Sequence, residues 1–208
     1  MLHDDAVLVT GLSVRREVAR KALHLLFVIV PVSYAAGLPR IPLVIMLATA
    51  AVLALVVEVA RAWHPATRER FGRAVGMLLR EHEQARWSGA TWLVLAMLGL
   101  AALAPPDVAI AGMWTVSAGD AAAALVGRAL GRRGGPGGGT GKTVRGSAAC
   151  FVVSLCGALA LAHLSLVEGV LAASLATAAE RPSGWMDDNA RIAIAVAGGI
   201  LLWRMMFS

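Results

Sequence analysis

Long apolar stretches alternate with short polar ones along most of the chain. Apolar runs able to cross about 30 Å of hydrocarbon, roughly 17 to 25 residues each, recur from residue 22 to the carboxyl terminus. They leave no room for a separate soluble domain, so we expect an all-α fold: one integral domain over residues 1–208, a polytopic membrane helix bundle with about seven transmembrane helices. The expected spans are 22–38, 41–60, 89–104, 108–127, 146–163, 165–179 and 190–207.

The first apolar run also has features of a signal peptide. Basic residues between positions 15 and 21 precede it, and Ser33-Tyr34-Ala35 could pass as a cleavage site. However, His24 lies inside the run and the chain continues as further membrane spans. We therefore expect a retained first helix.

The longest polar stretch runs from Arg61 to Ser88. Apolar residues recur within it at helical spacing, namely Phe71, Val75, Leu78 and Leu79. Two interpretations are equally good: an amphipathic helix lying on the membrane surface, or a solvated helix connecting two spans.

Composition and charge agree with a membrane protein. Hydrophobic residues make up 58% of the chain and charged residues 15%, which excludes an ordinary water-soluble globule. The net charge of +6 does not require a nucleic-acid partner, because basic loops orient membrane proteins and meet anionic headgroups. With the amino terminus inside, only Arg40 and Arg204 of the 19 basic residues lie outside. The predicted glycine-rich loop is then cytoplasmic.

The fourth span carries an acid, Asp120. Gly119, Ala123 and Gly127 repeat every four residues, which allows a neighbouring helix to approach closely and turns Asp120 toward protein. An acid inside a membrane span indicates a functional site, and the structural alternative is an ion pair with an arginine.

A glycine-rich loop follows this span. Gly137 to Thr143 resembles a P-loop, but Pro136 replaces a required glycine and no strand precedes the loop. Exposed backbone N–H groups and Lys142 could still hold phosphate, whereas the structural alternative is a flexible charged linker.

Other polar groups fall near the same membrane face. Lys21 and His24 share one helix face, where they could bind a phosphate or a lipid headgroup, although a lone histidine is more often a structural hydrogen-bonding residue. Glu58 could be an ordinary span terminus. The oxygen-rich Asp187, Asp188 and Asn189 suit either magnesium or capping of the last helix, with capping the simpler explanation for Asn189.

Together these landmarks resemble the CTP-dependent kinases of lipid alcohols, namely the dolichol, polyprenol, phytol and diacylglycerol kinases that use CTP. The matching residues run through nearly the whole chain: Arg20-Lys21-x-x-His24, Leu79-Arg80-Glu81-x-Glu83, Gly89-Ala90-Thr91-Trp92, Gly119-Asp120-Ala121-Ala122-Ala123, Gly127, Gly131, Gly141-Lys142-Thr143, Gly146-Ser147 and Asp188-Asn189.

The resemblance implies transfer of the CTP γ-phosphoryl group to a long-chain lipid alcohol at the cytoplasmic face of a bacterial-type inner or plasma membrane, with Mg²⁺ or another divalent metal. The enzyme alternative is a phosphatidate cytidylyltransferase, which also uses CTP and has a related arrangement of an acid, glycines and Lys-Thr. Neither the lipid alcohol nor the oligomeric state follows from the sequence.

The expected site combines these residues in three roles, with some further candidates. Catalytic candidates are Asp120 and Lys142. Candidates for nucleotide binding are Lys21, Gly127, Gly131, Gly141, Lys142, Thr143, Arg145 and Gly146. Metal candidates are Asp120, Asp187 and Asp188, and further candidates are His24, Glu58, Glu81, Glu180 and Asn189.

One residue departs from the family pattern. The family usually has an acid before the glycine at position 146, where this chain has Arg145. This departure supports a third alternative, a non-catalytic lipid-binding or transport protein on the same scaffold.

Overall fold

The computed structural model describes residues 20–22, 24–75, 87–130, 143–180 and 186–207. Every regular element in these ranges is a helix and none is a strand, which confirms the all-α prediction. The elements are α2 (Ile29–Ala35), α3 (Arg40–Trp63), α4 (Pro65–Val75), α5 (Gly89–Leu103), α6 (Pro106–Trp114), the π-helical turn η3 (Thr115–Gly119), α7 (Asp120–Leu130), α8 (Val144–Ala160), α9 (Leu166–Glu180) and α10 (Asp188–Phe207).

Three helices are long and apolar enough to cross a membrane. They are Arg40–Trp63, the continuous helix Pro106–Leu130 that joins α6, η3 and α7, and Asp188–Phe207. Gly89–Leu103 and Val144–Ala160 are shorter apolar helices. These helices agree with a membrane protein, and the count of seven spans stays a prediction.

The first expected span, 22–38, is not one regular helix. Helical residues 24–26 lead into a turn at Phe27 and Val28, and α2 begins only at Ile29. Pro31 accounts for the break, because it has no N–H to donate to the Phe27 carbonyl and its ring crowds that carbonyl.

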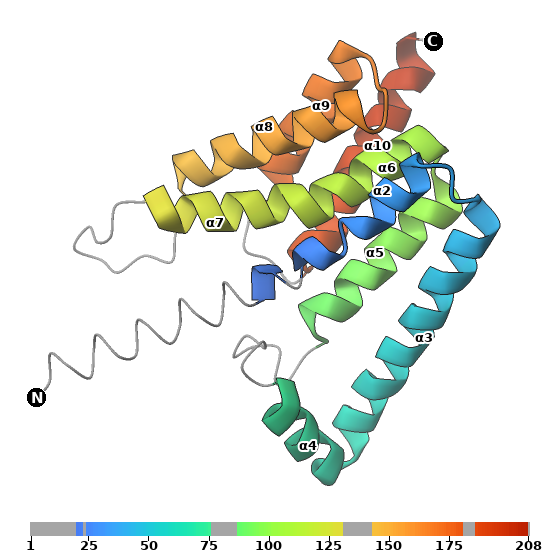
Figure 1. Cartoon of the computed structure of the whole chain (residues 1–208), viewed down its shortest axis with the longest axis vertical. Coiled ribbons are helices and arrows are strands. Elements are labelled where there is room, and N and C mark those ends of the chain that lie inside the picture. Colours follow the sequence, from blue (N-terminus) through green and yellow to red (C-terminus); the bar gives the residue numbers. More distant parts are fainter. Residues whose placement is uncertain (1–19, 23, 76–86, 131–142, 181–185, 208) are drawn as a thin grey trace, which may run out of the picture.

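The long helix Pro106–Leu130 forms the centre of the bundle (Figure 1). Within its apolar stretch 78% of the residues are buried, against 22% for α3 and 28% for α10. Helices α8, α9 and α10 pack successively around it, whereas α3 packs mainly along α5 and stands out on one side. Polar groups on the central helix are therefore the best shielded from lipid.

Helices α7 and α8 cross at very short range. A Cβ atom on Gly146 would lie 2.6 Å from the Ala123 carbonyl oxygen and 3.3 Å from the Cα of Gly127. Only glycine fits at this crossing, so the prediction that the small residues of the fourth span admit a close neighbour is confirmed.

An ion-pair cluster joins three helices at the opposite end from the polar site described below. Arg204 Nη2 lies 2.5 Å from Asp107 Oδ2, and Arg204 Nε lies 2.6 Å from Glu168 Oε1. Glu168 also accepts hydrogen bonds from the backbone N–H and hydroxyl of Ser165, which cap α9. One guanidinium thus ties the starts of α6 and α9 to the end of α10.

Substituting this arginine should loosen that end of the bundle. Arg204→Met keeps an apolar stem but leaves two carboxylates without their shared cation, so we expect a loss of about 1–2 kcal/mol of stability. Thermal unfolding in detergent measures the effect, and Met205→Ala, at an 83% exposed neighbouring position, is the matched control. Equal melting temperatures for Arg204→Met and the wild type would contradict a role for the cluster in stability.

Candidate polar site in the bundle

The π-helical turn η3 positions Asp120. The Asp120 N–H donates to the Thr115 carbonyl, five residues back, instead of the usual four. The extra residue in this turn rotates α7 relative to α6, and turns of this kind are frequent at functional sites. A Cβ on Gly119 would lie 2.6 Å from Ser154 Oγ, so the turn also rests directly on α8.

Asp120 forms an ion pair with Lys21 inside the protein. Lys21 Nζ donates to Asp120 Oδ2, and the two residues are only 2% and 4% exposed. The prediction that Asp120 faces protein is confirmed, and its partner is a lysine instead of the arginine considered above. An amino-terminal lysine and an acid of the central helix thereby neutralise each other away from water.

His24 and Asn189 extend this pair across the bundle. His24 Nε2 lies 3.5 Å from Asp120 Oδ2 and 3.0 Å from Asn189 Oδ1. Asn189 Nδ2 donates to the Gly89 carbonyl at 3.2 Å. Because a carbonyl only accepts, this bond turns Asn189 Oδ1 toward His24, and Nε2 must carry the proton between them. Four segments thus meet around Asp120: the amino-terminal segment, α5, α7 and α10.

The start of α10 corrects one expectation. Asp187 Oδ1 accepts the Asn189 N–H at 2.9 Å, so Asp187 caps this helix and Asn189 does not. Asn189, at 1% exposure, reaches inward instead. A cap must lie just outside the first turn, and Asn189 is already the second residue of α10.

A second polar cluster surrounds Glu58 at the junction of α3 and α5. Its carboxylate lies 2.5 Å from Arg61 Nη1 and accepts from the Ser88 N–H at 2.9 Å and from Thr91 Oγ1 at 3.0 Å. Glu58 is therefore more than an ordinary span terminus, because it fixes the start of α5. Gly89, the residue after Ser88, accepts the hydrogen bond from Asn189, so the two clusters adjoin.

The end of α7 and the start of α8, which flank the glycine-rich segment, lie close together. Thr143 Oγ1 caps α8 by accepting the Gly146 N–H at 3.1 Å, and Arg145 Nη1 donates to the Leu130 carbonyl. Gly127 faces the same place, since a Cβ there would lie 2.9 Å from Thr143 Oγ1. The same helix α7 therefore carries Asp120 at one end and the approach to the glycine-rich segment at the other.

Some expected site residues are not among these contacts. Gly131, Gly141, Lys142 and Glu81 lie outside the described ranges. Glu180 is buried at the end of α9, and Asp188 is the first residue of α10.

These donors do not fit a metal ion as they are arranged. Within the described ranges, no group of three or more His, Cys, Asp or Glu side chains could hold a metal. The Asp120 carboxylate already accepts a hydrogen bond from Lys21 Nζ, and the Asp187 carboxylate already caps α10.

Sequence reasoning missed two parts of this site. The π-helical turn has no recognisable local signal. The role of Ser88 could have been found, because a serine directly before an apolar helix, with Thr91 three residues later, has the spacing of a helix N-cap.

Comparison with known proteins adds no relative: no family model, no curated protein and no solved structure matches the chain.

Proposed function

We propose that this chain is a CTP-dependent kinase of a long-chain lipid alcohol that acts at the cytoplasmic face of a bacterial-type plasma membrane. The observation that carries the proposal is the buried Lys21–Asp120 pair, extended by His24 and Asn189, in a bundle with helices of membrane-spanning length. The sequence resemblance supplies the nucleotide and the class of acceptor.

The energetics of this pair favour a functional role. Removing both charges from water carries a desolvation penalty that their attraction often fails to offset, so a buried ion pair is weak evidence for stability alone. Ionisable groups within apolar helices mark functional sites by default. A buried Asp, Lys, His and Asn cluster where the starts of α5 and α10 meet the central helix is better explained by chemistry than by packing.

The residues suit phosphoryl transfer, which depends mainly on positioning and on neutralising phosphate charge. Lys21 supplies a cation for a donor phosphate, and the release of Asp120 from that pair would let its carboxylate orient the lipid hydroxyl. The start of α8, where Thr143 caps the helix by accepting from Gly146, packs against Gly127 of the same helix α7 that carries Asp120.

The charge distribution supports the proposed orientation. Arg204 and Arg40, the two basic residues expected outside, lie in contacts with residues of other predicted outer ends: Arg204 with Asp107 and Glu168, and Arg40 with the Ala101 carbonyl at 2.9 Å. The polar site uses helix ends that are expected inside. The lipid tail would remain among the helices, with its hydroxyl at the cytoplasmic interface.

CTP labelled separately at its α and γ phosphates tests the activity. With magnesium and a panel of polyprenol, phytol and diacylglycerol acceptors, we expect γ label in the lipid fraction and release of CDP. Reactions without a lipid alcohol are the control.

Two other results would overturn this proposal in different ways. Lipid that carries the α label, with release of pyrophosphate, would indicate cytidylyl transfer. CTP binding without transfer of either label to any acceptor would favour a non-catalytic lipid-binding protein.

A further inference from the structure

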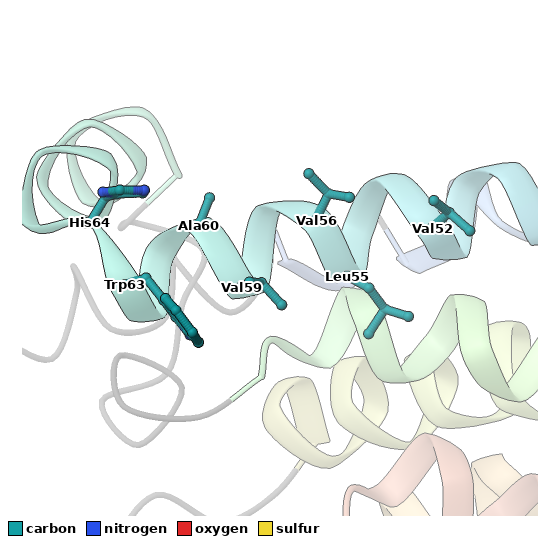
Figure 2. A pocket seen from close by; sticks show the side chains of 7 residues that line it. All are labelled: Val52, Leu55, Val56, Val59, Ala60, Trp63 and His64. Atoms are coloured by element: carbon teal, nitrogen blue, oxygen red, sulfur yellow. The ribbon is translucent and has the colours of Figure 1, made fainter.

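An open apolar groove runs along one face of α3. Its lining comes from a single helical stripe and the elbow that follows it: Val52, Leu55, Val56, Val59, Ala60, Trp63 and His64 (Figure 2). Val52 and Val56 are each 59% exposed and Trp63 is 80% exposed. The groove holds about 460 Å³, within the roughly 300–1,000 Å³ typical of small-molecule sites.

The groove ends at a basic elbow. The chain turns at His64 into α4, which carries three arginines and one glutamate, a net charge of +2. Arg68 donates from Nε to the Arg61 carbonyl at 3.3 Å and from Nη2 to the Ala62 carbonyl at 3.4 Å. These bonds anchor an exposed guanidinium to the backbone of the last turn of α3, the turn that also carries Trp63.

The other charges of α4 are also accessible to solvent. Arg73 Nη2 lies 3.6 Å from Glu69 Oε1, and both side chains are 71% exposed. An exposed pair of this kind stabilises little and can exchange its partner for another anion. Arg70 is likewise exposed.

We propose that this face of α3 and α4 binds an anionic glycerophospholipid of the bilayer. An acyl chain lies along the Val52–Trp63 stripe, and the headgroup phosphate lies at the elbow near Arg68, with Arg70 and Arg73 adding attraction. Charge complementarity selects the anionic lipid, because a basic residue near an anionic surface contributes about 1 kcal/mol. An exposed tryptophan at the end of an apolar helix is typical of the headgroup level. This site is separate from the proposed kinase site and does not depend on its activity.

Native mass spectrometry of the full chain in neutral detergent tests the proposal, with phosphatidylglycerol or phosphatidylcholine added as the probe. We expect phosphatidylglycerol to be retained more tightly. The double variant Arg70→Gln/Arg73→Gln should reduce that preference on the order of tenfold, whereas Glu69→Gln should increase it.

A matched pair of variants tests the groove itself. Val56→Trp fills the groove and should lower retention of phosphatidylglycerol, whereas Leu53→Trp adds the same ring at a 61% exposed position of α3 outside the groove lining and should not. Equal retention of the two lipids by the wild type, or an equal loss in both tryptophan variants, would overturn the proposal. Lipid kinase activity enters none of these measurements, so the two proposals can fail separately.

Discussion

Asp120→Asn is expected to abolish lipid kinase turnover and also to destabilise the protein. Loss of the carboxylate removes the group proposed to orient the lipid hydroxyl, and a positioned acid or base contributes on the order of 10²–10⁴-fold to rate. The variant also leaves the Lys21 ammonium buried without its counter-ion, which typically costs about 3–5 kcal/mol. Turnover and thermal unfolding, measured on the same preparation, report the two effects.

A second variant separates chemistry from stability. Lys21→Met combined with Asp120→Asn removes both charges, and replacing a whole buried pair by groups of similar volume is often neutral. We therefore expect the double variant to regain most of the stability that Asp120→Asn loses, without regaining activity. A folded Asp120→Asn variant with full turnover would remove Asp120 from the mechanism, and a double variant as unstable as Asp120→Asn would show that the unpaired lysine is not the cause.

The periodic part of the fold could be predicted from the sequence. The apolar runs locate α3, α5, α8 and α10 to within a few residues, because burial and helix length both follow hydropathy. The predictions missed two local features of the backbone. Pro31 breaks the first span, whereas η3 inserts a residue into the fourth without interrupting its continuous helix and without any local signal. Such events depend on packing that a periodic pattern does not encode.

The members of the site could be predicted better than their partners. Four residues stand out in the sequence because polar groups are costly in or beside apolar helices unless they are paired: Lys21, His24, Asp120 and Asn189. Their pairing joins Lys21 to Asp120 over 99 positions and His24 to Asn189 over 165. Local spacing carries no information at such separations. An arginine partner for Asp120 and a capping role for Asn189 were therefore reasonable expectations, but the tertiary structure pairs these residues with Lys21 and His24 instead.

Gly146→Ala is expected to have the largest effect of any single methyl addition at the crossing of α7 and α8. The new Cβ would meet the Ala123 carbonyl oxygen at 2.6 Å, closer than real Cβ contacts allow. The obstacle is backbone, so no side chain can rotate away and the helices must separate. Overpacking of this kind typically costs about 1–3 kcal/mol.

The same separation should impair nucleotide use. Gly146 adjoins Thr143, which caps α8, and Arg145, which links the start of α8 to the end of α7 at Leu130. A displacement of about 1 Å at a positioned group can lower rate on the order of 10²-fold, so we expect a raised KM for CTP and a lower kcat along with the lower melting temperature.

Gly198→Ala is the matched control for this substitution. It adds the same methyl group within α10, where a Cβ would meet nothing within 4 Å, and the higher helix propensity of alanine should stabilise the chain by up to about 1 kcal/mol. The two glycine-to-alanine changes are therefore expected to move the melting temperature in opposite directions, and only Gly146→Ala should change the kinetics with CTP. If both variants melt at or above the wild-type temperature, helices α7 and α8 do not cross as closely as the Ala123–Gly146 contact requires. If Gly146→Ala is destabilised but keeps wild-type kinetics, the crossing stabilises the bundle without positioning the nucleotide.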